Sequence, residues 1–200
     1  MATNYEMIYE KAAATFAQRG IRNVTMSEIA AECNISRRSL YQQFKSKEEL
    51  VFSMVESQLT ENKKLIDTAS KVLPDAVTEI SNFFKYLYRS LELMTPAFLD
   101  GIQRYYPKTF KLLADFRTNS LLPYLERNLN RGINEHLYRN DINGNVACNW
   151  YCSQLQNLFL DSSISGAERH QLLSNTNTFF ANCIVNGEGL LVLQLQQVAA

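Results

Sequence analysis

The stretch Thr25–Leu50, TMSEIAAECNISRRSLYQQFKSKEEL, contains three helix start signals in close succession. The first is a capping box, in which the Thr25 hydroxyl accepts from the Glu28 amide and the Glu28 carboxylate accepts from the Thr25 amide. The second is Ser36, which is placed to cap another helix. Each signal is a side-chain oxygen followed by a run of helix-compatible residues, so the stretch predicts consecutive short helices.

The third signal is a second capping box, Ser46 with Glu49, and it follows Phe44 at once. The middle helix therefore has room for about two turns. The connection before it, Cys33–Ser36, is tight, and Asn34 suits a left-handed turn position because asparagine tolerates a positive φ. Two short helices joined by such a turn are typical of a helix-turn-helix motif.

The charge of this stretch points to phosphate. From residue 33 to residue 47 there are four bases and no acid: Arg37, Arg38, Lys45 and Lys47. The chain as a whole has 20 basic and 20 acidic residues and a formal net charge of zero. A local basic face on a neutral chain indicates a surface for nucleic acid.

The same residues resemble the DNA-binding domain of the TetR family of bacterial repressors. The matching positions are Thr25, Ile29, Ala30, Ile35, Ser36, Leu40, Tyr41, Phe44 and 46–50, with Ala12, Phe16 and Gly20 upstream. The family usually has glycine where this chain has Asn34, and both residues serve a turn. It often has a small residue where this chain has Arg38, a difference that concerns the preferred DNA sequence rather than the fold.

We expect an all-α protein of about nine helices in two parts. Residues 1–46 form a three-helix DNA-binding domain, whose first helix runs from Asn4 to Arg19 and is closed by Gly20 in a left-handed cap. Residues 47–200 form a helical ligand-binding and dimerisation domain, with the long helix 47–72 as the connector.

Prolines divide the second part. Pro74, Pro96 and Pro107 are each suited to the first turn of a helix, where a missing amide hydrogen costs nothing. Pro123 should kink the helix that begins at Pro107. Two further helices follow, over residues 145–160 and 165–185, with a Gly-Glu-Gly segment (187–189) ending the second. The remaining residues form either a short helical extension or a frayed tail.

The expected DNA-binding surface comprises Thr25, Ser36, Arg37, Arg38, Ser39, Tyr41, Gln42 and Lys47. The resemblance implies phosphate contacts for Tyr41 and Lys47, and both can reach the duplex backbone. Residues 37–42 lie on the first turns of the reading helix, where arginine can fork onto guanine and glutamine onto adenine. Arg38 could instead contact phosphate alone, so the choice between the two arginines stays open.

The second part is rich in aromatic residues, which at helical spacing are usually core. The resemblance implies an inducer cavity there, for which the candidate lining is Phe84, Tyr88, Tyr105, Phe110, Tyr124 and Trp150. It also implies a homodimer formed through the last two long helices, whose apolar faces are broad, and we expect Phe180 on the exposed part of this surface. Paired DNA half-sites require such a dimer.

Other classes of function lack support in the sequence. We find no nucleophile–base–orienter trio, metal cluster, Gly-rich phosphate loop or membrane-spanning stretch, and we expect neither catalysis nor a cofactor. The four cysteines read as free thiols of a cytoplasmic protein. The sequence thus predicts a ligand-responsive repressor that binds a palindromic operator as a homodimer. The alternative is a helix-turn-helix module that binds protein or organises DNA without a small-molecule switch.

Overall fold

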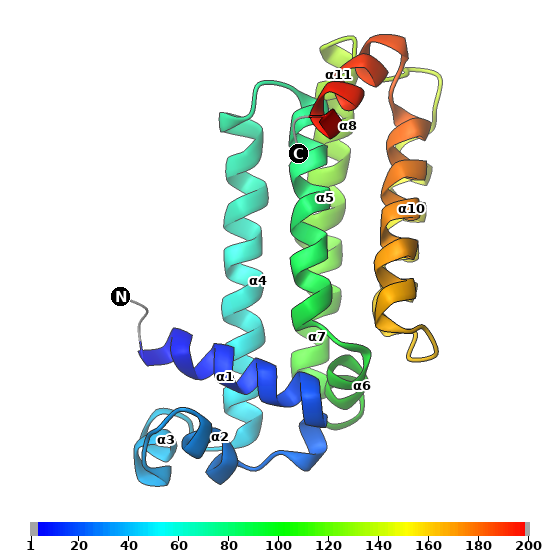
Figure 1. The fold of residues 1–200 in the computed structure, drawn as a ribbon. Helices are drawn as coiled ribbons and strands as arrows, with labels where there is room; N and C mark the ends of the chain where they lie inside the picture. The colour runs from blue at the N-terminus through cyan, green and yellow to red at the C-terminus, as the bar shows by residue number, and fades with distance from the viewer. Residues whose placement is uncertain (1–3, 199–200) are drawn as a thin grey trace. The chain divides into compact units, whose positions relative to one another are not determined.

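The computed structural model describes residues 4–198, apart from the side chains of residues 4, 92, 93 and 196–198. It contains α-helices and no β-strand over this range, so the predicted all-α fold class is confirmed (Figure 1). The elements are α1 (Asn4–Arg19), η1 (Ile21–Asn23), α2 (Met26–Glu32), α3 (Arg37–Gln43), α4 (Lys47–Val72), α5 (Ala76–Leu93), α6 (Pro96–Tyr105), α7 (Pro107–Phe116), η2 (Arg117–Leu121), α8 (Leu122–Asn134), α9 (Gly144–Leu160), α10 (Gly166–Ile184) and α11 (Gly187–Val198).

The chain divides into two compact units. The first comprises Met1–Thr60 with Glu92–Ala114, and the second comprises Glu61–Leu91 with Asp115–Ala200. The boundaries therefore fall inside α4, α5 and α7 rather than at residue 46. The division at residue 46 separates expected functions rather than packing units, and in that sense it stays a prediction.

The core of the first unit joins α6 to the three N-terminal helices. Phe16 of α1 stacks on Phe98 of α6 at 5.9 Å between ring centroids. A Cβ placed on Gly101 would lie 2.0 Å from the Ile21 side chain, so only glycine allows α6 to approach η1 this closely. We call this first unit the head. It is larger than the three-helix domain predicted from the sequence, because it includes α6.

The predicted Gly20 cap is confirmed in part. Its φ of 74° is positive as expected, but its ψ of 145° lies outside the left-handed helical region. The Gly20 amide donates to the Phe16 carbonyl at 2.9 Å, which closes α1. Glycine is required here because residues with a Cβ rarely adopt this combination of angles.

Two expected helix boundaries in the second unit are wrong, each because a side-chain cap lies nearby. Pro74 precedes α5 instead of occupying its first turn, since the Asp75 carboxylate accepts from the Thr78 amide at 2.7 Å. The segment 187–189 begins α11 rather than ending α10, because Asn186 Oδ1 accepts from the Gly189 amide at 3.0 Å.

Near Pro123, where we expected a kink, the helix changes type. The five residues of η2 form a π-helical segment, and Pro123 follows at the start of α8. A proline removes one amide donor from the helix ladder, and a π-helical turn is one way in which a helix accommodates the resulting mismatch.

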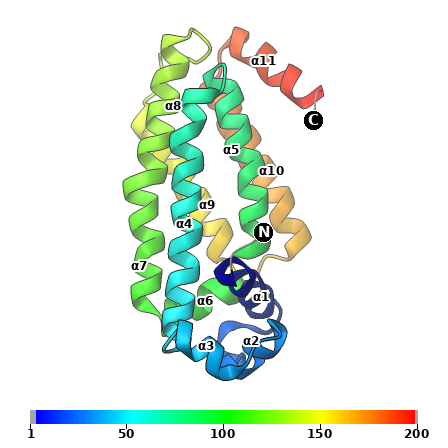
Figure 2. The same ribbon diagram turned by 90° about the vertical axis from the view of Figure 1, so that its left-hand side faces the viewer.

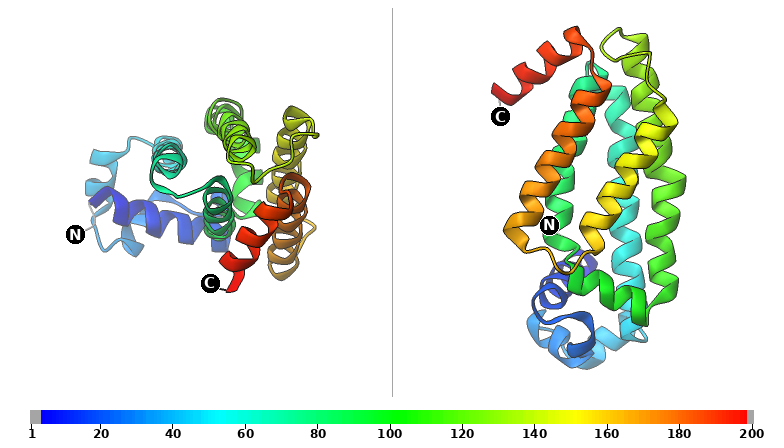
Figure 3. Two further views of the ribbon diagram at one scale, coloured as in Figure 1. Left: turned by 90° about the horizontal axis from the view of Figure 1, so that it is seen from above. Right: turned by 90° about the vertical axis from the view of Figure 1, so that its right-hand side faces the viewer.

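The core of the second unit is aromatic and aliphatic, and α10 packs along α9, as two views show (Figures 2 and 3). Tyr151 of α9 stacks on Phe180 of α10 at 4.2 Å between ring centroids, and both side chains are buried. Tyr138, in the connection after α8, forms an isolated bridge with Val185, which ties that connection to the end of α10.

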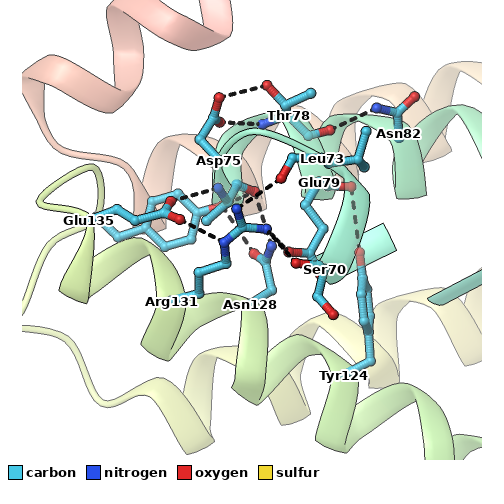
Figure 4. A network of polar contacts seen from close by, with 12 residues as sticks. Ser70, Leu73, Asp75, Thr78, Glu79, Asn82, Tyr124, Asn128, Arg131 and Glu135 are labelled. Atoms are coloured by element: carbon cyan, nitrogen blue, oxygen red, sulfur yellow. Dashed lines mark hydrogen bonds and ion pairs between the residues drawn. The ribbon is translucent and has the colours of Figure 1, made fainter. Parts of the chain in front are cut away.

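Arg131 of α8 organises a polar network at the end of α4 (Figure 4). Its guanidinium donates to the Glu79 carboxylate at 2.9 Å and the Glu135 carboxylate at 2.6 Å. It also donates to the carbonyl oxygens of Leu73 at 2.9 Å and Ser70 at 3.3 Å. A cation at a helix C-terminus satisfies carbonyl groups that have no intrahelical partner, so this arginine fixes where α4 ends.

Candidate nucleic-acid interface

The turn between α2 and α3 is a Schellman motif, as the position of Asn34 suggested. The Ile35 amide donates to the Ala30 carbonyl and the Asn34 amide to the Ala31 carbonyl, each at 3.0 Å. Asn34 has a φ of 54°, the left-handed conformation that the motif requires. These bonds set the angle at which α3 leaves α2, which is the defining feature of a helix-turn-helix.

The start of α2 carries the predicted capping box. The Thr25 hydroxyl accepts from the Glu28 amide at 3.3 Å, and the Glu28 carboxylate accepts from the Thr25 amide at 2.7 Å. Arg19 adds an ion pair to the same carboxylate. The bond from the Thr25 amide, together with the Arg19 guanidinium, lowers the pKa of Glu28 from 4.5 to about 2.

The start of α4 differs from the predicted capping box in one bond. Ser46 Oγ accepts from the Glu49 amide at 3.1 Å, as expected. The Glu49 carboxylate, however, accepts from the Lys45 amide at 2.6 Å, one residue before the amide predicted as its donor. Both bonds still hold the turn between α3 and α4 in one conformation.

The helix α3 presents polar side chains to solvent. Leu40 and Phe44 point into the core of the first unit and are 0% and 2% exposed. Arg37, Arg38 and Gln42 are exposed on the remaining surface. The Arg37 guanidinium lies over the Tyr41 ring, 5.4 Å from its centroid, which orients this arginine before any ligand arrives.

Ser36 and Ser39 form the N-terminal cap of α3. The Ser39 amide donates to Ser36 Oγ at 3.0 Å, and the two hydroxyl groups lie 2.8 Å apart. The Ser36 hydroxyl is therefore already engaged in capping α3. Thr25 has the same kind of role at α2, although both residues stay exposed and have hydroxyl groups at the surface.

Lys47 has a role that the sequence did not suggest. Its ammonium donates to the carbonyl oxygens of Ile21 and Val24, each at 2.8 Å, and more weakly to that of Arg22 at 3.5 Å. Partial burial lowers the pKa of Lys47. The three donors of an ammonium group are accounted for within the protein, so a phosphate contact would have to share or displace one of these bonds.

The six expected pocket residues fall into both compact units. Tyr105 and Phe110 belong to the first unit, where Tyr105 is 48% exposed and Phe110 packs against the core. The other four belong to the second unit. There Tyr124 is buried against Phe83, whereas Trp150 is 38% exposed and contacts Phe179. None of the ring contacts found among the described residues joins two of the six.

The outer surface of α9 and α10 carries exposed apolar side chains. They are Val146, Trp150, Leu172 and Phe179, and the rings of Trp150 and Phe179 lie 5.0 Å apart. Phe180, which the sequence suggested as part of this surface, is only 2% exposed and stacks on Tyr151. The assignment of Phe180 to the outer surface was wrong, because the inward face of α10 includes Leu173, Phe180 and Ile184.

Other kinds of site are absent from the part of the chain that the structure describes. No group of three or more histidine, cysteine or acidic side chains is arranged to hold a metal ion there. The cysteines at positions 33, 148, 152 and 183 are free thiols. No helix between residues 4 and 198 is long and apolar enough to cross a bilayer.

Together, the tight left-handed turn, the capped second helix and its exposed basic side chains define a helix-turn-helix protein of the DNA-binding class. Residues 8–54 match the family model for bacterial regulatory proteins of the tetR family. Residues 8–54 are therefore a helix-turn-helix DNA-binding domain of the tetR type. An uncharacterised HTH-type transcriptional regulator of Bacillus subtilis, YuxN, is 42% identical over 55 residues. That match covers 28% of this chain and only 19% of the relative's length.

Solved structures extend the similarity to the whole fold. Reduced NemR of E. coli matches with a TM-score of 0.73 at 13% identity, covering 91% of this chain and 97% of that one. The ketosteroid regulator KstR2 of Mycobacterium tuberculosis matches at 0.65 and 20%, covering 93% and 97%. FadR of Bacillus subtilis, in complex with stearoyl-CoA, matches at 0.65 and 15%, covering 90% and 99%.

Proposed function

We propose that this protein is a ligand-responsive transcriptional repressor that binds a palindromic operator as a homodimer in the bacterial cytoplasm. The observation that carries the proposal is the exposed surface of α3, where Arg37, Arg38, Tyr41 and Gln42 lie on a helix held by its caps. A recognition helix of this kind fits the major groove of B-DNA. Repression follows when the bound protein occupies DNA that RNA polymerase needs.

The apolar surface of α9 and α10 supports a dimer. Val146 and Phe179 are 62% and 57% exposed, and Trp150 and Leu172 lie with them on the outer side of the two helices. Large exposed aromatic and aliphatic groups gathered on adjacent helices are typical of an interaction surface. A second copy of the same helix pair would cover them in a four-helix arrangement and give two reading heads related by twofold symmetry.

The proposal includes a small-molecule effector. One structural neighbour is described as a ketosteroid regulator and another was solved with stearoyl-CoA, so the fold can hold small molecules. A ligand would release DNA by binding better to a conformation whose heads no longer match the half-sites. In the DNA-bound form we expect the two α3 helices to lie about 34–36 Å apart, one duplex turn.

The helix α4 is the expected connector, because it begins beside α3 and contributes residues to both compact units. Coupling between a ligand and DNA is usually about 1–3 kcal/mol, which corresponds to about 5–150-fold in operator affinity. The coupling must be reciprocal, so operator DNA should weaken ligand binding by the same factor. Calorimetry with and without operator would measure it directly.

To test the proposal, the protein is used to select DNA fragments from a random duplex pool. The most enriched sequence is then examined by gel shift. A repressor of this class should enrich an inverted repeat whose half-sites are one helical turn apart, and bind it as two protomers. Enrichment of no sequence, with equally weak binding to every duplex, would refute operator recognition. It would favour the alternative of a helix-turn-helix module that binds protein or organises DNA.

A further inference from the structure

Asn177 of α10 is a buried amide with one unpaired end. Its side chain is only 4% exposed, and its Oδ1 accepts a hydrogen bond from the Tyr151 hydroxyl at 2.6 Å. Its Nδ2 has no hydrogen-bond partner among the residues that the structure describes. Turning the amide over would pair the nitrogen with Tyr151 and leave the oxygen unpaired instead. Buried polar groups are nearly always hydrogen-bonded, so this one points to a molecule that completes the set.

The tyrosine that bonds this amide belongs to a group of aromatic side chains on α5, α9 and α10. Tyr151 stacks on Phe180 and also contacts Phe84 of α5, with ring centroids 6.1 Å apart. One turn further along α5, Tyr88 stacks on His170 of α10 at 6.0 Å. Phe84 and Tyr88 are each half-buried. Aromatic walls with a single polar group match the usual composition of small-molecule sites.

The engagement of the buried cation of α10 selects among ligands. Arg169 is the buried cation next to His170, and its guanidinium donates to four backbone carbonyls, those of Leu158, Phe159, Asp161 and Ile164. It is therefore already engaged in closing the turn between α9 and α10. A carboxylate placed beside Asn177 would lose its hydration without gaining a partner of opposite charge. A neutral acceptor has no such penalty.

We propose that the Asn177 amide binds the carbonyl oxygen of a neutral, ring-containing effector held between α5, α9 and α10. That this molecule acts as an effector rests on the proposed function, but the test of its binding does not involve DNA. The site keeps Phe84 and Tyr88 from the lining expected from the sequence. It leaves out Trp150, whose exposed ring contacts Phe179.

The test uses three small probes with the same ring system. 2-Acetylnaphthalene carries a ketone, 2-isopropenylnaphthalene replaces the oxygen by carbon, and 2-naphthoic acid carries a charge at pH 7. Ligand-observed NMR titrations of the full chain should show the ketone binding about tenfold tighter than the hydrocarbon, the effect of one net hydrogen bond. The acid should bind more weakly than the ketone.

Two variants assign the preference to Asn177. Asn177→Leu and Asn177→Met each remove both polar atoms and keep an apolar side chain of similar volume. Each should bind ketone and hydrocarbon equally, whereas the exposed neighbour variant Asn175→Leu should keep the tenfold preference. Equal binding of all probes by the unmodified protein, or an undiminished preference in both variants at position 177, would overturn the inference. So would tighter binding of the acid.

The outcome can be separated from that of the proposed function. Loss of the ketone preference together with a normal operator shift would overturn only the assignment of Asn177. An intact preference in a protein that enriches no DNA sequence would overturn only the repressor.

Discussion

The Lys47 ammonium lies 2.8 Å from the carbonyl oxygen of Val24, so the first residue of α4 is tied to the segment that precedes α2. The same ammonium bonds the carbonyl of Ile21 at the start of η1. A side chain expected to contact DNA phosphate thus holds together the two ends of the helix-turn-helix. Its effect on DNA binding and its effect on stability can be measured separately.

We predict that Lys47→Met destabilises the head, because it leaves two or three carbonyl groups without their charged donor. The expected cost is about 1–2 kcal/mol, or a Tm lower by about 2–8 °C for a chain of this size. The slope of log Kobs against log salt should change little. If Lys47 instead neutralised one phosphate per protomer, the slope of the dimer would flatten by roughly 2. Lys45→Met, at an exposed position, is the control for loss of charge alone.

The capping box of α2 should make the stability of the head depend on pH. The folded-state pKa of Glu28 is lowered from 4.5 to about 2, so its contribution is fully present above pH 4.5 and is lost as the pH falls toward 2. The Tm difference between the unmodified protein and Glu28→Ala should therefore be constant above pH 5 and shrink below pH 4.5. Thermal melts across pH 2.5–7 measure it, and a difference that grows in acid would contradict the assigned pairing.

Loss of Arg131 alone should lower the stability of the fold strongly, whereas loss of Arg131 and Glu79 together should lower it much less. Glu79 is 1% exposed, so Arg131→Met would leave a buried carboxylate without its cation and should cost about 3–5 kcal/mol. The double variant Arg131→Met with Glu79→Met should recover much of that loss, which denaturant melts can show. Arg127→Met is the surface control, since its ion pair with Asp67 is exposed and 3.4 Å long; it should cost less than about 1 kcal/mol.

Local signals in the sequence were sufficient for most of the helix boundaries. The bounds of α1 and α4 agree with prediction, because a cap or breaker lies next to each end. The Schellman turn at Asn34 was also predictable, since one residue type and two backbone bonds define it. The fold class could be predicted for the same reason, because helical periodicity and turn chemistry are properties of neighbouring residues.

Long-range contacts could not be predicted in the same way. Nothing near Lys47 in the sequence reveals that its ammonium reaches the carbonyl of Ile21, 26 residues earlier. The assignment of Phe180 to the outer surface was wrong, because the side chains of adjacent helix residues point in directions about 100° apart, and it is Phe179 that faces outward. Hydrophobicity alone does not tell which of two phenylalanines faces the core. The unpaired amide of Asn177 gave no signal at all, because asparagine is usually a surface residue.

Base reading should depend more on Arg37 than on Arg38. The Tyr41 ring holds the Arg37 guanidinium in place, so less side-chain entropy is lost when it forks onto a base. On the selected operator, Arg37→Ala should cost about 1–3 kcal/mol, and on unrelated duplex distinctly less. Arg38→Ala should weaken both by similar factors if it contacts phosphate alone. Fluorescence anisotropy on the two duplexes measures both, and the reverse order would transfer the reading role to Arg38.

The proposed dimer makes opposite predictions for two adjacent residues. Phe179 is 57% exposed beside Trp150, so Phe179→Glu should leave the fold intact and place a charge in the proposed interface. Sedimentation should then show monomers, and operator affinity should fall steeply, because two linked heads gain an effective concentration that one head lacks.

Phe180→Glu should instead unfold the second unit, since Phe180 is buried against Tyr151. Its circular dichroism melt should show the loss of stability directly. Thr178→Glu, at the exposed position that precedes Phe179 on α10, controls for charge added to the helix. A folded Phe179→Glu protein that remains a dimer with full operator affinity would place the interface elsewhere. Monomers that still bind the operator fully would show that the two heads act independently.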